Sequence, residues 1–247
     1  MNESYKIDIS NLKKTFKEKI ALDSINITFE PGHMHGIIGP EGAGKTTLFR
    51  MITGLLSPES GSINFINGNE IIERKNIKKH IAYMPERQSL YPDLSIEEHL
   101  RFFSALYKLS EDEYVTKTEQ LLVMTRLKPF QSRPAKKLSG GMYKKLGLMC
   151  ALLGMPKILI LDEPTNGVDP ISRREFWELL YGILDKNITI LISTAYMDEA
   201  ERCMKAHLIQ DGKLIVSGSP KDLLKAHHVA TVSDLFIKLT RPGALHA

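Results

Sequence analysis

The fold is decided by the stretch Gly39-Pro40-Glu41-Gly42-Ala43-Gly44-Lys45-Thr46. It follows the apolar run His35-Gly36-Ile37-Ile38 and precedes Thr47-Leu48-Phe49-Arg50-Met51-Ile52, whose apolar residues have helical spacing. A strand, a glycine-rich loop and a helix in this order are typical of a phosphate-binding P-loop.

The chemistry of a P-loop explains why these residue types are needed. Glycine lets the backbone curl so that successive N–H groups point inward, and the helix adds the positive end of its dipole. We expect Lys45 to reach the β- and γ-phosphates of a nucleotide and Thr46 to offer its hydroxyl to Mg²⁺. A tight glycine-rich turn without a ligand is the alternative, and the loop alone would also suit a kinase or a GTPase.

The composition of the 247 residues is ordinary for a globular protein, with 43% hydrophobic and 25% charged residues. This length allows one large domain or two small ones. The net charge of +4 is too small to indicate a strong nucleic-acid binder. We expect Arg74, Lys75, Lys78 and Lys79 to lie in a solvated loop, and we expect no nucleic-acid partner.

The cysteines and the apolar segments suggest where the protein works. Cys150 and Cys203 lack the spacing of a metal or redox motif, so we expect buried free thiols, as in a reducing cytosol. The first residues carry no secretory signal. The longest uncharged apolar stretch, residues 146–155, is about half a membrane span. We therefore expect that the chain does not cross a bilayer and that any membrane role comes through a partner.

Hydrophobic periodicity predicts an alternation of strands and helices. Strands are expected at 7–9, 25–29, 62–66, 80–84, 158–161 and 188–192, before the P-loop, and in a hairpin over 208–216. Helices are expected after the N-cap Ser95 with Glu98 as its capping-box partner, at 112–127, from about Ser139, at 173–184, at 196–203 and twice after Pro220. Residues 87–153 are thus expected to be a mostly helical insertion.

Two further motifs carry chemistry. Asp162 and Glu163 end the buried strand 158–161, where Asp162 would hold Mg²⁺ through water and Glu163 would orient or deprotonate a nucleophilic water. Capping of a following helix is the alternative for this acidic pair.

A second glycine-rich loop, Leu138-Ser139-Gly140-Gly141-Met142, precedes a predicted helix and offers a second set of N–H donors to an anion. A plain helix N-cap is the alternative for this loop. Two phosphate loops for one nucleotide suggest a head-to-tail dimer, in which each Ser139 loop closes over the partner's ATP.

These motifs together resemble the ATP-binding subunit of ABC transporters, over residues 5–224. The branch is indicated by two stretches similar to ABC-2 type exporters, Tyr83-Met84-Pro85-Glu86-Arg87 and Asn166-Gly167-Val168-Asp169-Pro170. The continuation Ile171-Ser172-Arg173-Arg174 is especially similar to the YbhF-like multidrug exporters. The resemblance implies an α/β fold: a P-loop NTPase of ABC type, with a RecA-like parallel core, an N-terminal antiparallel β subdomain and a helical insertion. It implies a single domain, with the core and β subdomain at 5–86 and 154–218, the helical subdomain at 87–153 and a tail at 219–247.

The resemblance also assigns roles to individual residues. Phe16 would stack on adenine, with a plain core phenylalanine as the alternative; Thr47 would contact the α- and β-phosphates; Asp169 would lie in the loop between the two ATP sites. The expected ATP contacts are Phe16, Gly39, Pro40, Glu41, Gly42, Ala43, Gly44, Lys45, Thr46, Thr47, Glu86, Ser139, Gly140, Gly141 and Asp169. The catalytic residues would be Lys45 and Glu163, and the metal ligands Thr46, Glu86 and Asp162. ATP and Mg²⁺ are the implied cofactors.

Two residues depart from the pattern of the family. Glu86 stands where the family usually has Gln, which places a charged group beside the metal. Ala195 stands where the family usually has His in a Ser-Thr-His run, and a methyl group cannot bond the γ-phosphate. The loss of such a contact commonly costs about 10²–10³ in rate. We expect an ATPase whose rate is lowered by Ala195.

The implied partners are a second ATP-binding domain, as a homodimer or in tandem, and transmembrane permease subunits that residues 86–94 and the helices after them would contact. The protein would then lie at the cytoplasmic face of the inner or plasma membrane, bound through the permease. Two other functions stay open. One is a weakly hydrolysing regulatory ATP switch, the degenerate half of a pair. The other is a soluble ABC ATPase acting on nucleic acid or ribosomes. Residues 241–247 resemble a linker, which would suit one domain of a longer tandem chain.

Overall fold

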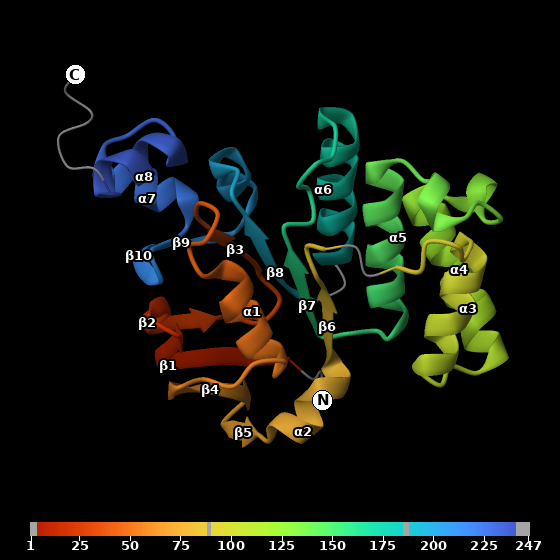
Figure 1. Cartoon of the computed structure of the whole chain (residues 1–247), viewed down its shortest axis with the longest axis horizontal. Coiled ribbons are helices and arrows are strands. Elements are labelled where there is room, and N and C mark those ends of the chain that lie inside the picture. The colour runs from red at the N-terminus through yellow and green to blue at the C-terminus, as the bar shows by residue number, and fades with distance from the viewer. Residues whose placement is uncertain (1–3, 88–89, 185–187, 241–247) are drawn as a thin grey trace.

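Two β-sheets and a group of helices make up the computed structural model, which describes residues 4–87, 90–184 and 188–240 (Figure 1). The first sheet is four-stranded in the order β2-β1-β4-β5 and antiparallel. Its strands are β1 (Lys6–Phe16), β2 (Lys19–Phe29), β4 (Ser60–Asn67) and β5 (Glu70–Ile72). Ile7 and Ile9 of β1 pair with Phe29 and Ile27 of β2, and all four side chains are buried. Because alternate residues point to opposite faces, one face covers the core and the other meets solvent.

The second sheet has six strands in the order β10-β9-β3-β8-β7-β6. They are β3 (Met34–Ile38), β6 (Ile81–Met84), β7 (Ile158–Asp162), β8 (Thr189–Thr194), β9 (Lys205–Gln210) and β10 (Lys213–Gly218). Neighbouring strands are parallel except β10, which pairs antiparallel with β9. Every residue of β3, β7 and β8 is buried, as expected for parallel strands covered on both faces.

The carboxyl ends of β3, β7 and β8 meet at one edge of this sheet. Ile38 pairs with Thr194, and Asp162 pairs with Ser193. The segments that follow these strands therefore begin side by side, which is where an open α/β sheet binds its ligands.

The helical segment holds α3 (Ile96–Leu106), α4 (Glu111–Thr125) and α5 (Gly140–Leu153) and lies at the right of Figure 1. Capping boxes open α3 at Ser95 with Glu98 and α4 at Ser110 with Glu113. Its apolar side chains form a cluster of their own, which includes Leu100, Leu122 and Leu146. Since α5 also packs on β6 and α6, this helix joins the segment to the parallel sheet.

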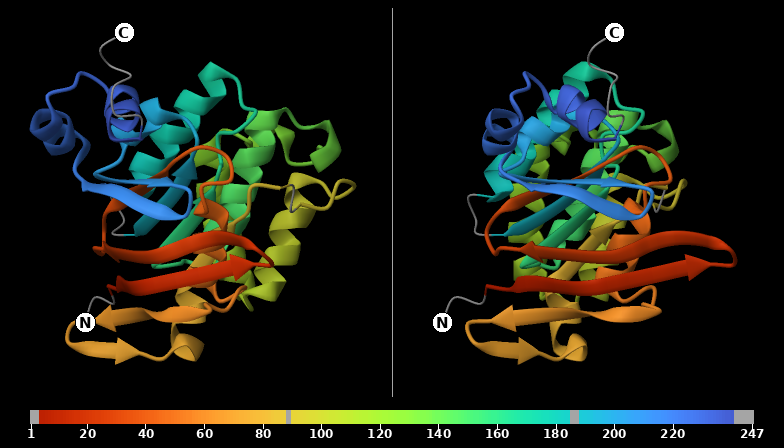
Figure 2. Two further views of the ribbon diagram at one scale, coloured as in Figure 1. Left: turned by 60° about the vertical axis from the view of Figure 1, so that its left-hand side comes forward. Right: turned by 90° about the vertical axis from the view of Figure 1, so that its left-hand side faces the viewer.

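The remaining helices complete the described chain. They are α1 (Lys45–Thr53), α2 (Arg74–Ile77), α6 (Pro170–Leu184), α7 (Pro220–His227) and α8 (Val232–Thr240). Figure 2 shows α7 and α8 at one end of the molecule and the strands of the four-stranded sheet at the other. In the part of the chain that the structure describes, no helix is long and apolar enough to span a bilayer.

The sequence-based fold class is confirmed: parallel strands, an antiparallel β-sheet and an inserted helical segment are all present. One local expectation was wrong, and the short helix expected at 196–203 is present in 3₁₀ form. Arg74 begins the short helix α2 and donates to the Met51 carbonyl at 2.6 Å, so the basic run does not form a solvated loop. The segment Met197–Arg202 is a 3₁₀ helix. Cys150 and Cys203 are free and buried as expected, and residues 241–247 lie outside the described chain.

Candidate functional site

The P-loop runs from the end of β3 at Ile38 to the start of α1 at Lys45. Gly44 is the N-cap of α1 with φ 105°, a conformation that side chains disfavour. A Cβ atom at Gly44 would also lie 2.4 Å from the Ala21 carbonyl oxygen. The glycine therefore lets the helix begin directly at Lys45, with its free N–H groups facing the cavity above the loop.

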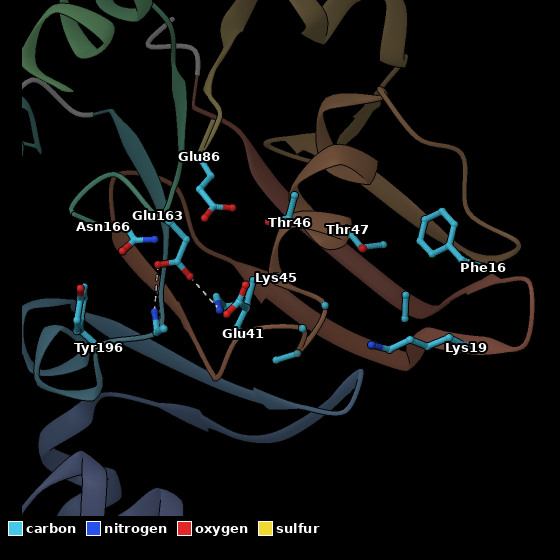
Figure 3. A pocket seen from close by; sticks show the side chains of 15 residues that line it. Phe16, Lys19, Glu41, Lys45, Thr46, Thr47, Glu86, Glu163, Asn166 and Tyr196 are labelled. Carbon is cyan, nitrogen blue, oxygen red and sulfur yellow. Dashed lines mark hydrogen bonds and ion pairs between the residues drawn. The ribbon is translucent and has the colours of Figure 1, made fainter. Parts of the chain in front are cut away.

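A cavity of ≈ 490 Å³ lies over this loop (Figure 3). It is lined by Phe16, Lys19, Ala21, Glu41, Gly42, Ala43, Gly44, Lys45, Thr46, Thr47, Glu86, Glu163, Asn166, Ala195 and Tyr196. Ten of the sequence-predicted site residues are among them. Nine of these ten come from the P-loop with the start of α1 and from the segments after β6 and β7, at one edge of the parallel sheet, and Phe16 comes from β1 of the four-stranded sheet.

Lys45 and Glu163 form an ion pair inside this cavity. The Lys45 ammonium is only 5% exposed; its Nζ lies 2.9 Å from Glu163 Oε1 and donates to the carbonyls of Gly39 at 2.7 Å and Pro40 at 3.0 Å. The Ala195 N–H donates to the other Glu163 oxygen, Oε2, at 3.2 Å. Figure 3 shows the Glu163 carboxylate pointing toward Lys45. The carboxylate is thus held at the cavity wall by a cation and a backbone donor.

Asp162 lies behind the cavity and is fully buried. Hydroxyls donate to both of its carboxylate oxygens: Thr46 at 3.1 Å and Ser193 at 2.6 Å to Oδ1, and Tyr83 at 3.0 Å to Oδ2. Burial and the nearby Asp162 charge raise the pKa of Tyr83, so its phenol stays protonated as the donor. The carboxylate therefore binds three hydroxyls rather than capping a helix, and the nearest downstream helix begins only at Pro170.

The oxygen groups here fit Mg²⁺. Thr46 and Asp162 are in contact, and Glu86 reaches the same cavity from the segment after β6 (Figure 3). No cluster of three or more His, Cys, Asp or Glu side chains that could hold a metal occurs among the described residues. Mg²⁺ keeps waters and shares its shell with substrate phosphates, so one hydroxyl and one or two carboxylates suit it.

Phe16 and Lys19 line one end of the cavity, and Asn166 lies at the other end beside Glu163 (Figure 3). Phe16 is 47% exposed, which rules out a core phenylalanine, and the Lys14 ammonium lies over its ring, 5.5 Å from the centroid. Lys19, three residues later in the β1–β2 hairpin, and Asn166, after β7, were not predicted as site residues. For Lys19 no motif signals its place. Asn166 was quoted only as part of a motif, and its position after the strand of Asp162 could have indicated it.

The Ser139 loop lies outside this cavity. Ser139 and Gly140 are exposed, and Ser139 Oγ accepts from the Met142 N–H at 3.3 Å as the N-cap of α5. Gly141 is packed so closely that a Cβ would lie 2.5 Å from Ser172 Cβ. Within one chain the loop is therefore a helix N-cap pressed against α6, and its N–H groups do not meet the P-loop.

Asp169 also lies away from the cavity, at the start of α6. Its Oδ1 accepts from the N–H groups of Ile171 at 3.1 Å and Ser172 at 3.0 Å. These backbone donors hold the pKa of Asp169 below its usual value. Gly39 and Pro40 do not line the cavity either, but their carbonyls bind Lys45.

Comparison with known proteins places this geometry in a family. The signature of the family described as ABC transporter matches residues 22–166, more than half of the chain. The chain belongs to the ABC transporter family. It is 43% identical over 225 residues to "Probable multidrug ABC transporter ATP-binding protein YbhF" of Escherichia coli, a match that covers 90% of this chain and 39% of YbhF. It is 34% identical to "Nod factor export ATP-binding protein I" of Cupriavidus metallidurans, over 93% of this chain and 76% of that protein.

Solved structures agree with this family. One described as an ATP binding subunit of an ABC transporter has a TM-score of 0.82 at 30% identity and covers 95% of this chain and 99% of its own. CbiO1 of Clostridium perfringens, part of the ABC transporter complex cbiONQ, has a TM-score of 0.80 at 28% identity, covering 99% and 98%. ABC ATP-binding proteins are ATPases, so the expectation of an ATPase is confirmed at the level of the family. This ABC ATP-binding domain spans about two fifths of the length of YbhF.

Proposed function

We propose that this domain binds and hydrolyses ATP to power a membrane exporter. One observation carries the proposal: Lys45 and Glu163 face each other in the cavity over the P-loop, with the Thr46–Asp162 pair directly behind them. A cation for phosphate, a carboxylate for water and oxygen ligands for a metal are the groups that phosphoryl transfer to water requires. The multidrug and Nod factor export named for the relatives supports an export role.

The residues divide the work of hydrolysis. The P-loop N–H groups and Lys45 bind the phosphates, Thr47 adds a contact to the α- and β-phosphates, and Phe16 stacks on adenine. Glu163 takes a proton from water as the water oxygen bonds to the γ-phosphorus, and the bond from that phosphorus to the bridging oxygen of ADP breaks. Thr46, Asp162 and Glu86 would hold Mg²⁺, which neutralises developing charge on the phosphates. ADP and phosphate then leave.

A second copy completes the site in this proposal. The Ser139 loop is exposed, opens α5 with free N–H groups and lies outside the cavity of its own chain. In a head-to-tail dimer Ser139, Gly140 and Gly141 would contact the γ-phosphate bound by the partner's P-loop, and Asp169 would lie between the two sites. ATP binding then brings two domains together, and hydrolysis lets them separate.

The proposed arrangement also fixes the domain plan and the location. We assign residues 5–86 and 154–218 to the nucleotide-binding core with its β subdomain, 87–153 to the helical subdomain and 219–247 to the tail, in a single ABC ATPase domain. A permease would contact residues 86–94 and the following helices, and the protein would bind the cytoplasmic face of the membrane through it.

A weakly hydrolysing ATP switch is the second candidate, and one observation favours it. Ala195 offers only a methyl group at the cavity, on the side where the γ-phosphate would lie. Its N–H is already bound to Glu163. Slow hydrolysis would make ATP binding, rather than turnover, the signal that the domain transmits.

Glu163→Gln tests the leading proposal. The amide cannot accept the proton of the water, so we expect the ATPase rate of the purified chain to fall at least about 100-fold while ATP still binds. Glu178→Gln is the matched control, because Glu178 is an exposed carboxylate on α6 that pairs with Arg174 outside the cavity. An unchanged rate in Glu163→Gln would refute the role of Glu163.

A further inference from the structure

Ser193 is a buried serine at the edge where β8 approaches the site. It is fully inaccessible to solvent and pairs in the sheet with Asp162 of β7. It does not line the cavity, so it cannot touch the nucleotide directly. Any effect of Ser193 on the reaction must therefore pass through its neighbours.

The Ser193 hydroxyl joins the two acidic residues of the site. Its Oγ donates to Asp162 Oδ1 at 2.6 Å and accepts from the Glu163 N–H at 2.9 Å. A hydroxyl carries one proton, so the donation to Asp162 fixes the rotamer, and the lone pair that remains faces the Glu163 amide. One side chain thus sets the orientation of a metal-binding carboxylate and of the next peptide unit.

This peptide unit has an unusual conformation. Glu163 has φ 46°, in the left-handed region that residues other than glycine enter rarely. Its N–H is bound by Ser193 Oγ at 2.9 Å and by the Ser193 carbonyl oxygen at 3.2 Å. This backbone conformation directs the Glu163 side chain toward Lys45, with 2.9 Å between Oε1 and Nζ. The hydrogen bonds that hold the backbone in this conformation therefore also hold the carboxylate at the cavity.

The second oxygen of Asp162 is supported independently. Tyr83 OH donates to Oδ2 at 3.0 Å, on the side of the carboxylate away from the oxygen that Ser193 contacts. The two hydroxyls are therefore separable: Tyr83 supports Asp162 and also interacts with the Arg50 side chain, whereas Ser193 contacts both Asp162 and Glu163.

We propose that Ser193 is a positioning residue that couples the orientation of the metal-binding Asp162 to that of the general base Glu163. The proposal rests on the function proposed above. Side chains that hydrogen-bond to a metal ligand typically contribute 10- to 100-fold to metal affinity or to activity.

The test compares Ser193→Ala with Tyr83→Phe in the full chain. Binding of a fluorescent ATP analogue is measured with Mg²⁺ and with EDTA, and kcat is measured at saturating ATP and Mg²⁺. We expect both variants to reduce the gain in nucleotide affinity that Mg²⁺ provides, and Ser193→Ala to lower kcat by about 10-fold or more, a larger loss than that of Tyr83→Phe. Affinity in EDTA should stay unchanged in both, because neither side chain lines the cavity.

Ser104→Ala is the control for the loss of a buried hydroxyl. Ser104 is buried on α3, and its Oγ donates to the Arg101 carbonyl at 2.7 Å, within its own helix. A Ser193→Ala chain that keeps the wild-type kcat and the wild-type Mg²⁺ effect overturns the proposal, as does an equal loss of kcat in Ser104→Ala. A wild-type chain that binds ATP with Mg²⁺ but never hydrolyses it refutes the proposed function instead. In that case the gain in nucleotide affinity with Mg²⁺, compared between the wild type and Ser193→Ala, would still show whether Ser193 supports Asp162.

Discussion

Two glycine-rich loops precede helices in this protein, and they differ in how many contacts their polar side chains make within the same chain. In the P-loop, Lys45 is buried and bonded to two backbone carbonyls and to Glu163. In the loop that opens α5, Ser139 is exposed, and its hydroxyl meets only the N–H of its own helix. Both loops offer helix N-termini to an anion, but they face different cavities: the P-loop faces the one that holds Lys45 and Glu163, whereas Leu138 and Gly140 line a second one of ≈ 470 Å³.

This difference predicts whether the effect of a substitution on activity appears in a single chain or only in a dimer. A change in the P-loop alters a network inside the chain, so its effect is visible in a single molecule. A change at Ser139 alters an exposed surface, so in the proposed dimer its effect appears only when two chains share a site. The following predictions test that distinction, beginning with the largest expected effect.

The first prediction concerns mixed dimers of Lys45→Met and Ser139→Arg chains. Each variant alone should lose nearly all ATPase activity, because every shared site contains the defect. In a 1:1 mixture, each mixed dimer carries one site with both defects and one intact site, so about a quarter of all sites recover. The measurement is the ATPase rate of the mixture against each variant alone.

Thermal unfolding of the separate variants serves as the control. Lys45→Met leaves the Glu163 carboxylate buried without its counter-ion, which costs about 3–5 kcal/mol of unfolding free energy. Ser139→Arg removes a helix N-cap, worth about 1 kcal/mol. A mixture of folded variants with no recovered activity would show that the two loops do not share a site.

The second prediction concerns Ala195→His on the P-loop side. An imidazole at this position adds a polar group at the cavity where only a methyl group now lies, so we expect a rate increase of about 10- to 100-fold. Ala195→Leu is the matched control, because it adds bulk without a donor and should give no increase. If Ala195→His has the wild-type rate, the γ-phosphate side of the site does not limit hydrolysis.

The third prediction concerns the loss of unfolding free energy at low pH, which we expect to come more from the parallel sheet next to the P-loop than from the helical segment. His35 of β3 and His207 of β9 are buried and bonded to each other at 3.1 Å. Burial lowers the pKa of His35 to about 4 and that of His207 to about 3. Above pH 6.5 both histidines are neutral whether the chain is folded or unfolded, so they have no effect there. Below it the unfolded chain binds protons first, and the free energy of unfolding falls by about 1.4 kcal/mol per pH unit for each histidine, down to about pH 4.

Urea unfolding between pH 7.5 and 5 measures this slope. The double variant His35→Leu with His207→Leu should lose most of it. A smaller part should remain from His99 in α3, whose pKa burial also lowers. A double variant with the wild-type slope would place the acid sensitivity elsewhere.

Much of the fold was predictable because its signals are local. Ser95 and Glu98 form their capping box between neighbours in sequence, and the apolar runs of β7 and β8 indicate strands buried on both faces. The P-loop was predictable for the same reason: strand, glycines, Lys45 and Thr46 are contiguous.

The rest depends on contacts between distant segments. The bond from Ser193 to Asp162 spans 31 residues, and the pair of His35 with His207 spans 172, so neither follows from local spacing. The ion pair of Lys45 with Glu163 was equally hidden, although both residues were predicted as catalytic. Sequence motifs named these residues, but only the sheet order brings them into contact.

Within the cavity, Lys45 already has a counter-ion in the same chain. Glu163 already neutralises Lys45, so an incoming triphosphate must replace one anion with another rather than bind a bare cation. Nucleotide affinity then reflects the difference between two ion pairs and is lower than the charge of Lys45 alone would give. When the γ-phosphate has gone, the carboxylate can return to the lysine. The proposed general base would thus also favour release of the products.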